Sequence, residues 1–203
     1  PSGAKLGFWD NLEFPIREII EYDGLVLFAT EDGVERFNET TFSWESTWTP
    51  GNGLPNNVGD WVGELWTDGQ HLLVGTATFA WWGGFQRGVI GHLDGSTGAW
   101  STVETGQNGI PNGYPLSMSQ CGSYVYIGLL NNNGGIVSMD LNSSSVVGSF
   151  TTSVLSNGRV AAVACDSVAT LYVGYDEDDQ GISKYDTVAV SYTHLRAHET
   201  LTD

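Results

Sequence analysis

The stretch Leu171-Tyr172-Val173-Gly174-Tyr175 is one of four apolar segments in which a small residue follows a hydrophobic run. Each segment follows a polar turn and precedes a loop, a glycine and another apolar segment. The pattern recurs roughly every 50 residues, a spacing typical of folds built from repeated small sheets. The other three segments are Leu25-Val26-Leu27-Phe28-Ala29-Thr30, Leu72-Leu73-Val74-Gly75-Thr76 and Tyr124-Val125-Tyr126-Ile127-Gly128.

The residues around these segments complete a four-stranded unit. Asp23-Gly24 and Asp68-Gly69 favour tight hairpin turns before the second strand of a unit. Third strands are expected to begin at Gly33, Gly88, Gly135 and Gly181, and fourth strands to end near Trp44 or Trp48, Trp100 and Phe150. The sequence therefore predicts an all-β fold, a partial β-propeller that forms an open arc of about three to four four-stranded antiparallel blades.

The same pattern divides the chain into repeats. Residues 1–14 are expected to end a preceding blade, 15–55, 56–111 and 112–157 to form one blade each, and 158–189 to form an incomplete blade. Because a closed propeller needs at least about four blades, we expect missing blades of the same parent chain to cover the open ends.

Residues 190–203 are expected to lie outside the repeats. Val190-Ser191-Tyr192-Thr193-His194-Leu195-Arg196-Ala197-His198-Glu199-Thr200 resembles a translated sequencing adapter. The chain also begins without a methionine, so we expect a fragment of a longer, metagenomic sequence. His194 and His198 have a spacing found in zinc sites. On this interpretation they carry no function.

Composition narrows the class of protein. The chain has 7 Lys and Arg against 24 Asp and Glu, a net charge of −17. Such an acidic surface repels phosphates, so a nucleic acid partner is not expected. The 8 Trp, 8 Tyr and 8 Phe distinguish the chain from acidic disordered proteins. Membrane insertion within this fragment is not expected, because no apolar run reaches the ~20 residues of a membrane span.

Short motifs resemble one propeller family. Gly53-Leu54-Pro55-Asn56-Asn57-Val58 and Gly109-Ile110-Pro111-Asn112 precede first strands, and Leu73-Val74-Gly75-Thr76 precedes Gly88-Val89. Together they are similar to the repeats of two-component-regulator propellers, over roughly residues 8–187. The later repeat departs from the pattern, with Leu155-Ser156-Asn157 in place of Gly-Leu-Pro. The resemblance implies the sensory ectodomain of a larger receptor.

One loop is rich in aromatic residues. Between the second and third strands of the second repeat, residues 77–87 are expected to form a loop that contains Phe79, Trp81, Trp82, Phe85 and Arg87. Aromatic side chains stack on sugar rings and anchor protein partners. We therefore predict ligand binding by these five residues. The alternative is that the tryptophans only pack on an adjacent blade or cover the channel.

Other candidates are weaker. Asp176, Asp178 and Asp179 belong to an acidic loop that could bind Ca²⁺, although a solvated loop is the simpler interpretation, and no cofactor is otherwise expected. Cys121 and Cys165 occupy matching positions in successive repeats. We expect two buried thiols, with a disulfide as the alternative.

These observations favour a binding module over an enzyme. We predict a secreted, periplasmic or surface-exposed β-propeller fragment that binds a carbohydrate or protein ligand, with a sensory role as one form of that function. One alternative is a propeller hydrolase or lyase whose active site is completed by missing blades. Another is a purely structural repeat of a large surface protein.

Overall fold

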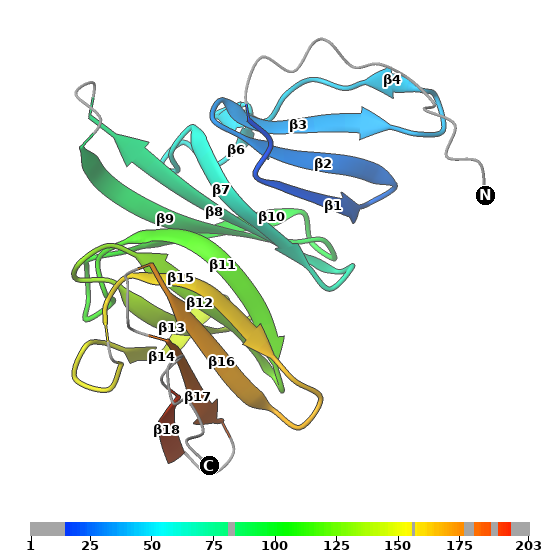
Figure 1. Ribbon diagram of the computed structural model, residues 1–203. Helices are drawn as coiled ribbons and strands as arrows, with labels where there is room; N and C mark the ends of the chain where they lie inside the picture. Colours follow the sequence, from blue (N-terminus) through cyan, green and yellow to red (C-terminus); the bar gives the residue numbers. More distant parts are fainter. Residues whose placement is uncertain (1–14, 81–83, 156, 177–180, 188–190, 196–203) are drawn as a thin grey trace, which may run out of the picture.

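The computed structural model describes residues 15–80, 84–155, 157–176, 181–187 and 191–195. These residues form four four-stranded antiparallel sheets and one two-stranded sheet, with no helix among them. The sheets follow one another around an open arc (Figure 1). The predicted all-β, partial propeller is confirmed.

Each large sheet is built from consecutive strands. The first sheet contains β1 (Glu18–Tyr22), β2 (Leu25–Thr30), β3 (Gly33–Asn38) and β4 (Ser43–Trp44). The second contains β7 (Trp61–Thr67), β8 (His71–Phe79), β9 (Phe85–Asp94) and β10 (Ala99–Glu104). The third contains β11 (Tyr114–Cys121), β12 (Tyr124–Leu130), β13 (Gly135–Asp140) and β14 (Ser145–Phe150). The fourth contains β15 (Val160–Cys165), β16 (Thr170–Tyr175), β17 (Ile182–Asp186) and β18 (Ser191–Leu195).

A short connection joins the first two sheets. β5 (Thr49–Pro50) and β6 (Gly53–Leu54) pair in parallel. Leu54, from the Gly-Leu-Pro turn, is buried in the core between these two sheets. The turn therefore fixes the path of the chain from one blade to the next.

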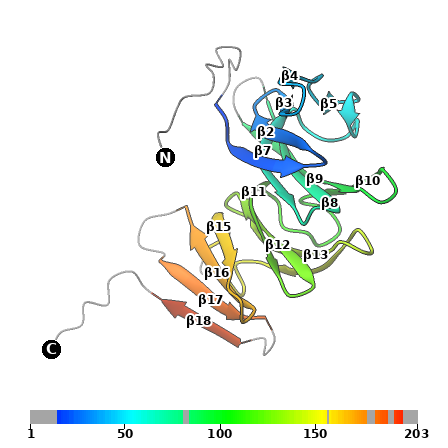
Figure 2. The same ribbon diagram turned by 90° about the vertical axis from the view of Figure 1, so that its right-hand side faces the viewer.

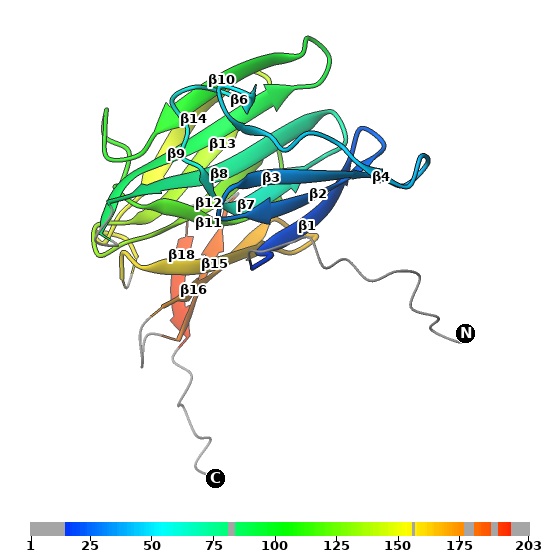
Figure 3. The same cartoon turned by 90° about the horizontal axis from the view of Figure 1, so that it is seen from above.

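The first strand of every sheet lies on the inner side of the arc. Each is an edge strand of its sheet and pairs antiparallel with the second strand. Figure 2 shows β7, β11 and β15 following one another along this side. Seen from above, the strands of the first and second sheets run broadly alongside one another (Figure 3). We call β1, β7, β11 and β15 the inner strands.

The core consists of three apolar layers between consecutive sheets. Leu27 packs with Val62 and Val74 between the first two sheets. Leu73 packs with Ile127 between the second and third sheets. The third layer lies between the last two sheets. Because both faces of the middle sheets are covered, their second strands, β8 and β12, are buried at nearly every position, which explains the lack of alternation in these segments.

Two glycines set the distance between sheets. A Cβ atom on Gly75 of β8 would lie 2.7 Å from Cβ of Pro115 on the next inner strand. One on Gly128 of β12 would lie 2.7 Å from Cγ1 of Val160. At these two positions the small residue of the repeated segment therefore makes room for the following blade.

Side chains also join neighbouring inner strands by hydrogen bonds. The Ser117 hydroxyl accepts a bond from the Val163 N–H at 3.0 Å, and the Ser119 hydroxyl accepts one from the Cys165 N–H at 3.0 Å. These bonds satisfy edge-strand donors that have no partner within their own sheet.

The expectation of two buried thiols is wrong. Cys121 and Cys165 form a disulfide between β11 and β15, with their Cα atoms 5.4 Å apart. The side-chain bonds of Ser117 and Ser119 bring the two inner strands within the range that a disulfide needs. The bridge therefore joins the third blade covalently to the fourth.

The fourth sheet includes part of the adapter-like segment. β18 pairs antiparallel with β17, placing Ser191 opposite Asp186. Pairing at an open sheet edge depends mainly on backbone groups. The adapter interpretation, like the blade boundaries, therefore stays a prediction, and residues 1–14 and 196–203 lie outside the described residues.

We expect the double variant Cys121→Ser/Cys165→Ser to be less stable by about 4 kcal/mol, since the bridge closes a loop of 44 residues. For a chain of this size the loss corresponds to a fall in Tm of roughly 10 °C. Calorimetry with and without reductant measures it. Reductant should lower the Tm of the parent chain but not that of the double variant. Equal values for all samples would contradict the bridge.

Candidate functional site

One end of the inner strands gathers the aromatic and basic side chains. β1, β7, β11 and β15 all begin at this end, where the β8–β9 hairpin also turns (Figure 1). The ends of the second strands and the starts of the third strands lie there too, because consecutive strands are antiparallel. Loops distant in sequence therefore share one face.

Four half-buried aromatic rings form a continuous cluster at this end. Trp61 makes edge contacts with Phe79, at a centroid distance of 5.5 Å, and with Tyr114, at 5.4 Å. Phe85 lies 6.1 Å from Phe79 and 5.6 Å from Tyr114. Phe79 and Tyr114 are 5.7 Å apart. We call these four residues the aromatic cluster. It joins the second blade to the third, and each of its four residues is only partly buried.

The prediction of a loop over residues 77–87 is wrong in its length. β8 continues to Phe79 and β9 already begins at Phe85, with Thr78 paired to Arg87. Apolar and β-branched residues on both sides favour continued pairing over an open loop. Phe79, Phe85 and Arg87 therefore lie on the paired strands of the β8–β9 hairpin, and Arg87 is half-buried. Trp81 and Trp82 lie outside the described residues.

Two ion pairs flank the aromatic cluster. On the first blade, Arg17 binds Glu31 with Nη2 and Oε1 2.7 Å apart, and its guanidinium carbon lies 4.8 Å from the Trp61 ring centroid. On the fourth blade, Arg159 pairs with Asp176 and also donates to Oδ1 of Asn132 at 3.3 Å.

Both ion pairs act electrostatically on the hydroxyl group of Tyr114. Burial raises the pKa of the Tyr114 hydroxyl above its ordinary value. The charges of Arg159, Asp176 and Arg17 act on the same hydroxyl, in that order of size. Because the two cations largely balance their carboxylate partners, the site presents paired donors and acceptors rather than one sign of charge.

The predicted calcium ligands are only partly described. Asp176 is engaged by Arg159, while Asp178 and Asp179 lie outside the described residues. In the part of the chain that the structure describes, no group of three or more His, Cys, Asp or Glu side chains is arranged to hold a metal. Within the same residues, no helix could span a membrane.

The sequence did not predict four residues of the candidate site, which are Trp61, Tyr114, Arg17 and Arg159. A signal does exist for two of them, because Trp61 and Tyr114 stand at the same spacing before Gly75 and Gly128. Both begin an inner strand that contains a register shift, between Val62 and Glu64 or between Pro115 and Ser117. Such a bulge redirects side chains in a way that the sequence does not reveal.

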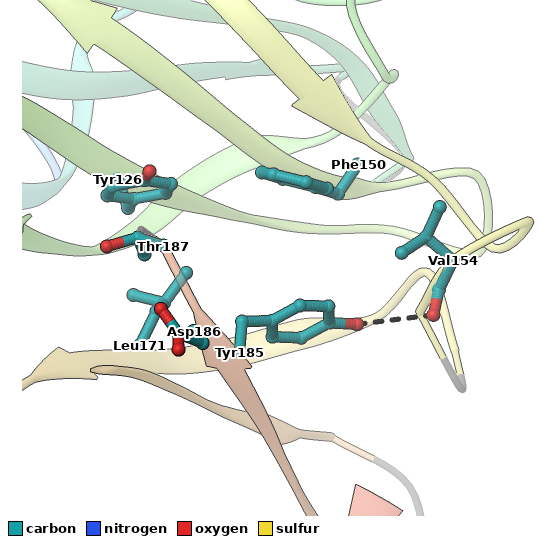
Figure 4. Close-up of a pocket in the computed structure, with 7 residues that line it drawn as sticks. All are labelled: Tyr126, Phe150, Val154, Leu171, Tyr185, Asp186 and Thr187. Carbon is teal, nitrogen blue, oxygen red and sulfur yellow. Dashed lines mark hydrogen bonds between the residues drawn. The ribbon is translucent and has the colours of Figure 1, made fainter. Parts of the chain in front are cut away.

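A hollow lies between the third and fourth blades. Figure 4 shows Tyr126 and Phe150 on one side of it and Leu171 and Tyr185 on the other, with the Tyr185 hydroxyl donating to the Val154 carbonyl. Its volume is about 90 Å³, well below the ~300 Å³ at which ligand pockets begin. We interpret it as a packing gap.

Comparison with known proteins supports the fold. No protein-family model and no curated protein matches the chain. Among solved structures, it is similar to the extracellular domain of BT3049 from B. thetaiotaomicron, assigned to the hybrid two component systems. The TM-score is 0.65 with 18% identity, over 93% of this chain and 25% of that one. The corresponding domain of BT4673 from the same organism has a TM-score of 0.63 and 15% identity, and the match covers 94% of this chain and 23% of that one.

A third similar structure is the WD40 domain of Pan2 from Neurospora crassa. Its TM-score is 0.58 with 11% identity, over 89% of this chain and 50% of that one. The chain thus spans about a quarter of the length of the two bacterial domains. At these identities the likeness establishes the propeller-type fold.

The position of Trp61 depends on Gly63, because a Cβ atom there would collide with the Trp61 ring. We expect Gly63→Ala to displace this ring and to cost roughly 1–3 kcal/mol of stability. Near-ultraviolet circular dichroism and thermal melts would measure both effects. Gly174→Ala is the matched control, since its Cβ would meet Ala162 at an ordinary 3.6 Å. Identical behaviour of the two variants would contradict the proposed packing.

Proposed function

We propose that the chain is the ligand-binding part of an extracellular or periplasmic sensory β-propeller, and that the aromatic cluster binds a sugar ring of a carbohydrate ligand. The observation that carries the proposal is the group of half-buried rings of Trp61, Phe79, Phe85 and Tyr114 between two Arg–carboxylate pairs. Apolar sugar faces stack on such rings. Guanidinium donors and carboxylate acceptors at the rim match ligand hydroxyl groups.

Two further observations support the location and the sensory role. The Cys121–Cys165 disulfide suits an oxidising compartment. The similar bacterial structures are extracellular domains assigned to hybrid two component systems. A membrane anchor and a signalling domain would then belong to the remainder of the parent protein.

A protein ligand is the other partner that suits an aromatic cluster. The carbohydrate is favoured because the rim carries an ion pair on each of two separate blades, and each pair offers both donors and acceptors to ligand hydroxyl groups. An enzyme is less well supported. The half-buried Glu64 on β7 already accepts a hydrogen bond from the Met118 N–H at 3.1 Å, so its carboxyl group is engaged in joining strands.

The test is binding of the full chain to a panel of neutral and acidic hexasaccharides, measured by calorimetry. We expect Trp61→Ala to weaken binding of any hexasaccharide that binds by at least about tenfold, since a central Trp typically contributes 1.4 kcal/mol or more. Tyr124→Ala is the control, because this exposed tyrosine starts β12 at the opposite end of the blade.

Three outcomes would count against the proposal. If none of the hexasaccharides binds, the proposed carbohydrate ligand is contradicted. If Trp61→Ala and Tyr124→Ala weaken binding equally, the proposed location of the site is contradicted. Release of new reducing ends during incubation would show a hydrolase instead.

A further inference from the structure

A buried pair of histidines lies at the boundary between the second and third blades. His71 begins β8, and His92 lies on β9 opposite Leu73, which packs in the apolar layer between these blades. The centroids of the two imidazole rings are 5.3 Å apart. His92 is fully buried and His71 is 8% exposed. Two ionisable rings therefore lie in contact beside an apolar layer.

His92 connects the two blades through one ring nitrogen. Its Nδ1 atom lies 2.9 Å from the hydroxyl oxygen of Ser144, in the turn between β13 and β14. The Ser101 hydroxyl oxygen of β10 is farther from the same nitrogen, at 3.5 Å. The bond to Ser144 thus holds the β13–β14 turn of the third blade against the second blade.

The other ring nitrogen has no such contact. Nε2 of His92 is buried and makes no hydrogen bond within the part of the chain that the structure describes. A neutral imidazole carries hydrogen on one nitrogen, whereas a protonated imidazole carries hydrogen on both. Protonation without movement would therefore bury a charged ring together with an N–H group that has no acceptor, and both are costly in a protein interior.

The nearest charges do not offset this cost. The Asp68 carboxylate lies 3.0 Å from Nδ1 of His71, so it accompanies that ring. Asp94 is bonded within the turn that follows β9. Burial first, and the charge of His71 second, lower the pKa of His92, against smaller opposing effects of Asp94 and Asp68. The His92 ring is therefore neutral at pH 7.

The other strands around His92 supply few ionisable groups. Arg87 lies near the opposite end of β9 and Glu104 at the end of β10. Glu64 on β7 is bonded to the Met118 N–H, and Asp140 at the end of β13 is bonded within its own turn. β14 has no ionisable group. Those of β11 and β12, apart from the disulfide, are the hydroxyl groups of Tyr114, Tyr124 and Tyr126.

A groove on the same boundary gives the β13–β14 turn room to move. Its volume is about 400 Å³, and it lies between β10 and the first residues of β14. Ser144 is one of the residues that line it. Ser144 therefore contacts the buried ring and also faces an open groove. A displacement of the turn would connect the His92 ring with solvent, where water can accept hydrogen bonds from both N–H groups.

We propose that His92 is an acid-sensitive contact between the second and third blades. Its neutral ring holds the Ser144 turn in place, and its protonation releases the turn and lets water reach the ring. The blade boundary thus loosens as the pH falls below neutrality. The proposal concerns the contact between blades and does not depend on the ligand proposed above.

The titration is tested by NMR of the histidine rings in the full chain, with the His92 signals assigned from His92→Asn. We expect a His92 midpoint below the ordinary value of 6.5. His71→Gln should raise this midpoint, because it removes the neighbouring cation. The control His194→Gln, on β18 of the fourth blade, should leave it in place. A midpoint at or above 6.5, or one that does not respond to His71→Gln, would overturn the role of the pair.

The release has its own readout, which is amide hydrogen exchange of residues 141–146. The exchange rate of the parent chain is divided by that of His92→Asn at the same pH, so that the intrinsic effect of pH on exchange cancels. This ratio should rise about fivefold from pH 7 to pH 5, as expected for the loss of one hydrogen bond. If His92 titrates while the ratio stays constant, the release of the turn is contradicted.

A second pair of variants tests the bond to the turn and leaves the ring unchanged, so it serves even if His92→Asn does not fold. Ser144→Ala removes the hydroxyl that meets Nδ1, and exchange of the turn should become about fivefold faster at pH 7. Ser143→Ala is the matched control, because this exposed hydroxyl is bonded to Ser145 within the same turn. Equal exchange in the two variants would show that the His92–Ser144 bond does not hold the turn, and the proposal would fail.

Thermal stability provides a measure with a defined sign. The unfolded chain gains the His92 proton near pH 6.5, and the folded chain gains it only at lower pH. The stability contributed by the neutral ring is therefore complete above pH 6.5 and is lost as the pH falls toward the lower pKa. The Tm of the parent chain should fall relative to that of His92→Asn between pH 7 and pH 5.

Glu64 does not disturb this comparison. Burial raises its pKa to about 8, so its contribution to stability grows as the pH falls over the same range. That effect is opposite in sign and common to both chains. If the Tm curves of the parent chain and His92→Asn run parallel from pH 7 to pH 5, the buried ring is not the acid-sensitive group and the proposal is wrong.

Discussion

The close approach of consecutive sheets at a small residue is the constraint on which the rest of the structure depends. At Gly75 and Gly128 the next inner strand occupies the space that a side chain would need. This approach lets Ser117 and Ser119 reach the neighbouring backbone and brings Cys121 within bonding distance of Cys165. It also places Tyr114 against rings of the preceding blade. The fold and the candidate site therefore share one cause.

The sequence predicted the architecture well because the repeat is encoded locally. Strands β2, β3 and β13 have the bounds expected from their apolar runs and opening glycines. Each blade is a simple meander, so strand order follows chain order. Such a fold needs little long-range information, and a period of apolar segments was sufficient to recognise it.

The candidate site was less predictable because it depends on contacts between blades. Phe79 and Phe85 were identified from their unusual composition, yet their partners Trp61 and Tyr114 come from other strands. The disulfide was not expected for the same reason, since its geometry depends on the spacing of inner strands. Whether two residues meet across a blade boundary is set by sheet twist and by bulges such as the one at Gly63, which a single sequence does not specify.

The blade boundaries differ in how they would respond to mechanical force. Among the described residues, only β11 and β15 are joined by a covalent bond between side chains of neighbouring sheets. A chain pulled from its ends could lose its first blades without extending the 44-residue span that the bridge encloses. That span would keep roughly 150 Å of contour length hidden until the bridge is reduced. A surface protein built this way would unfold under force one blade at a time. The final step would extend the 44-residue span only in an environment that reduces the disulfide.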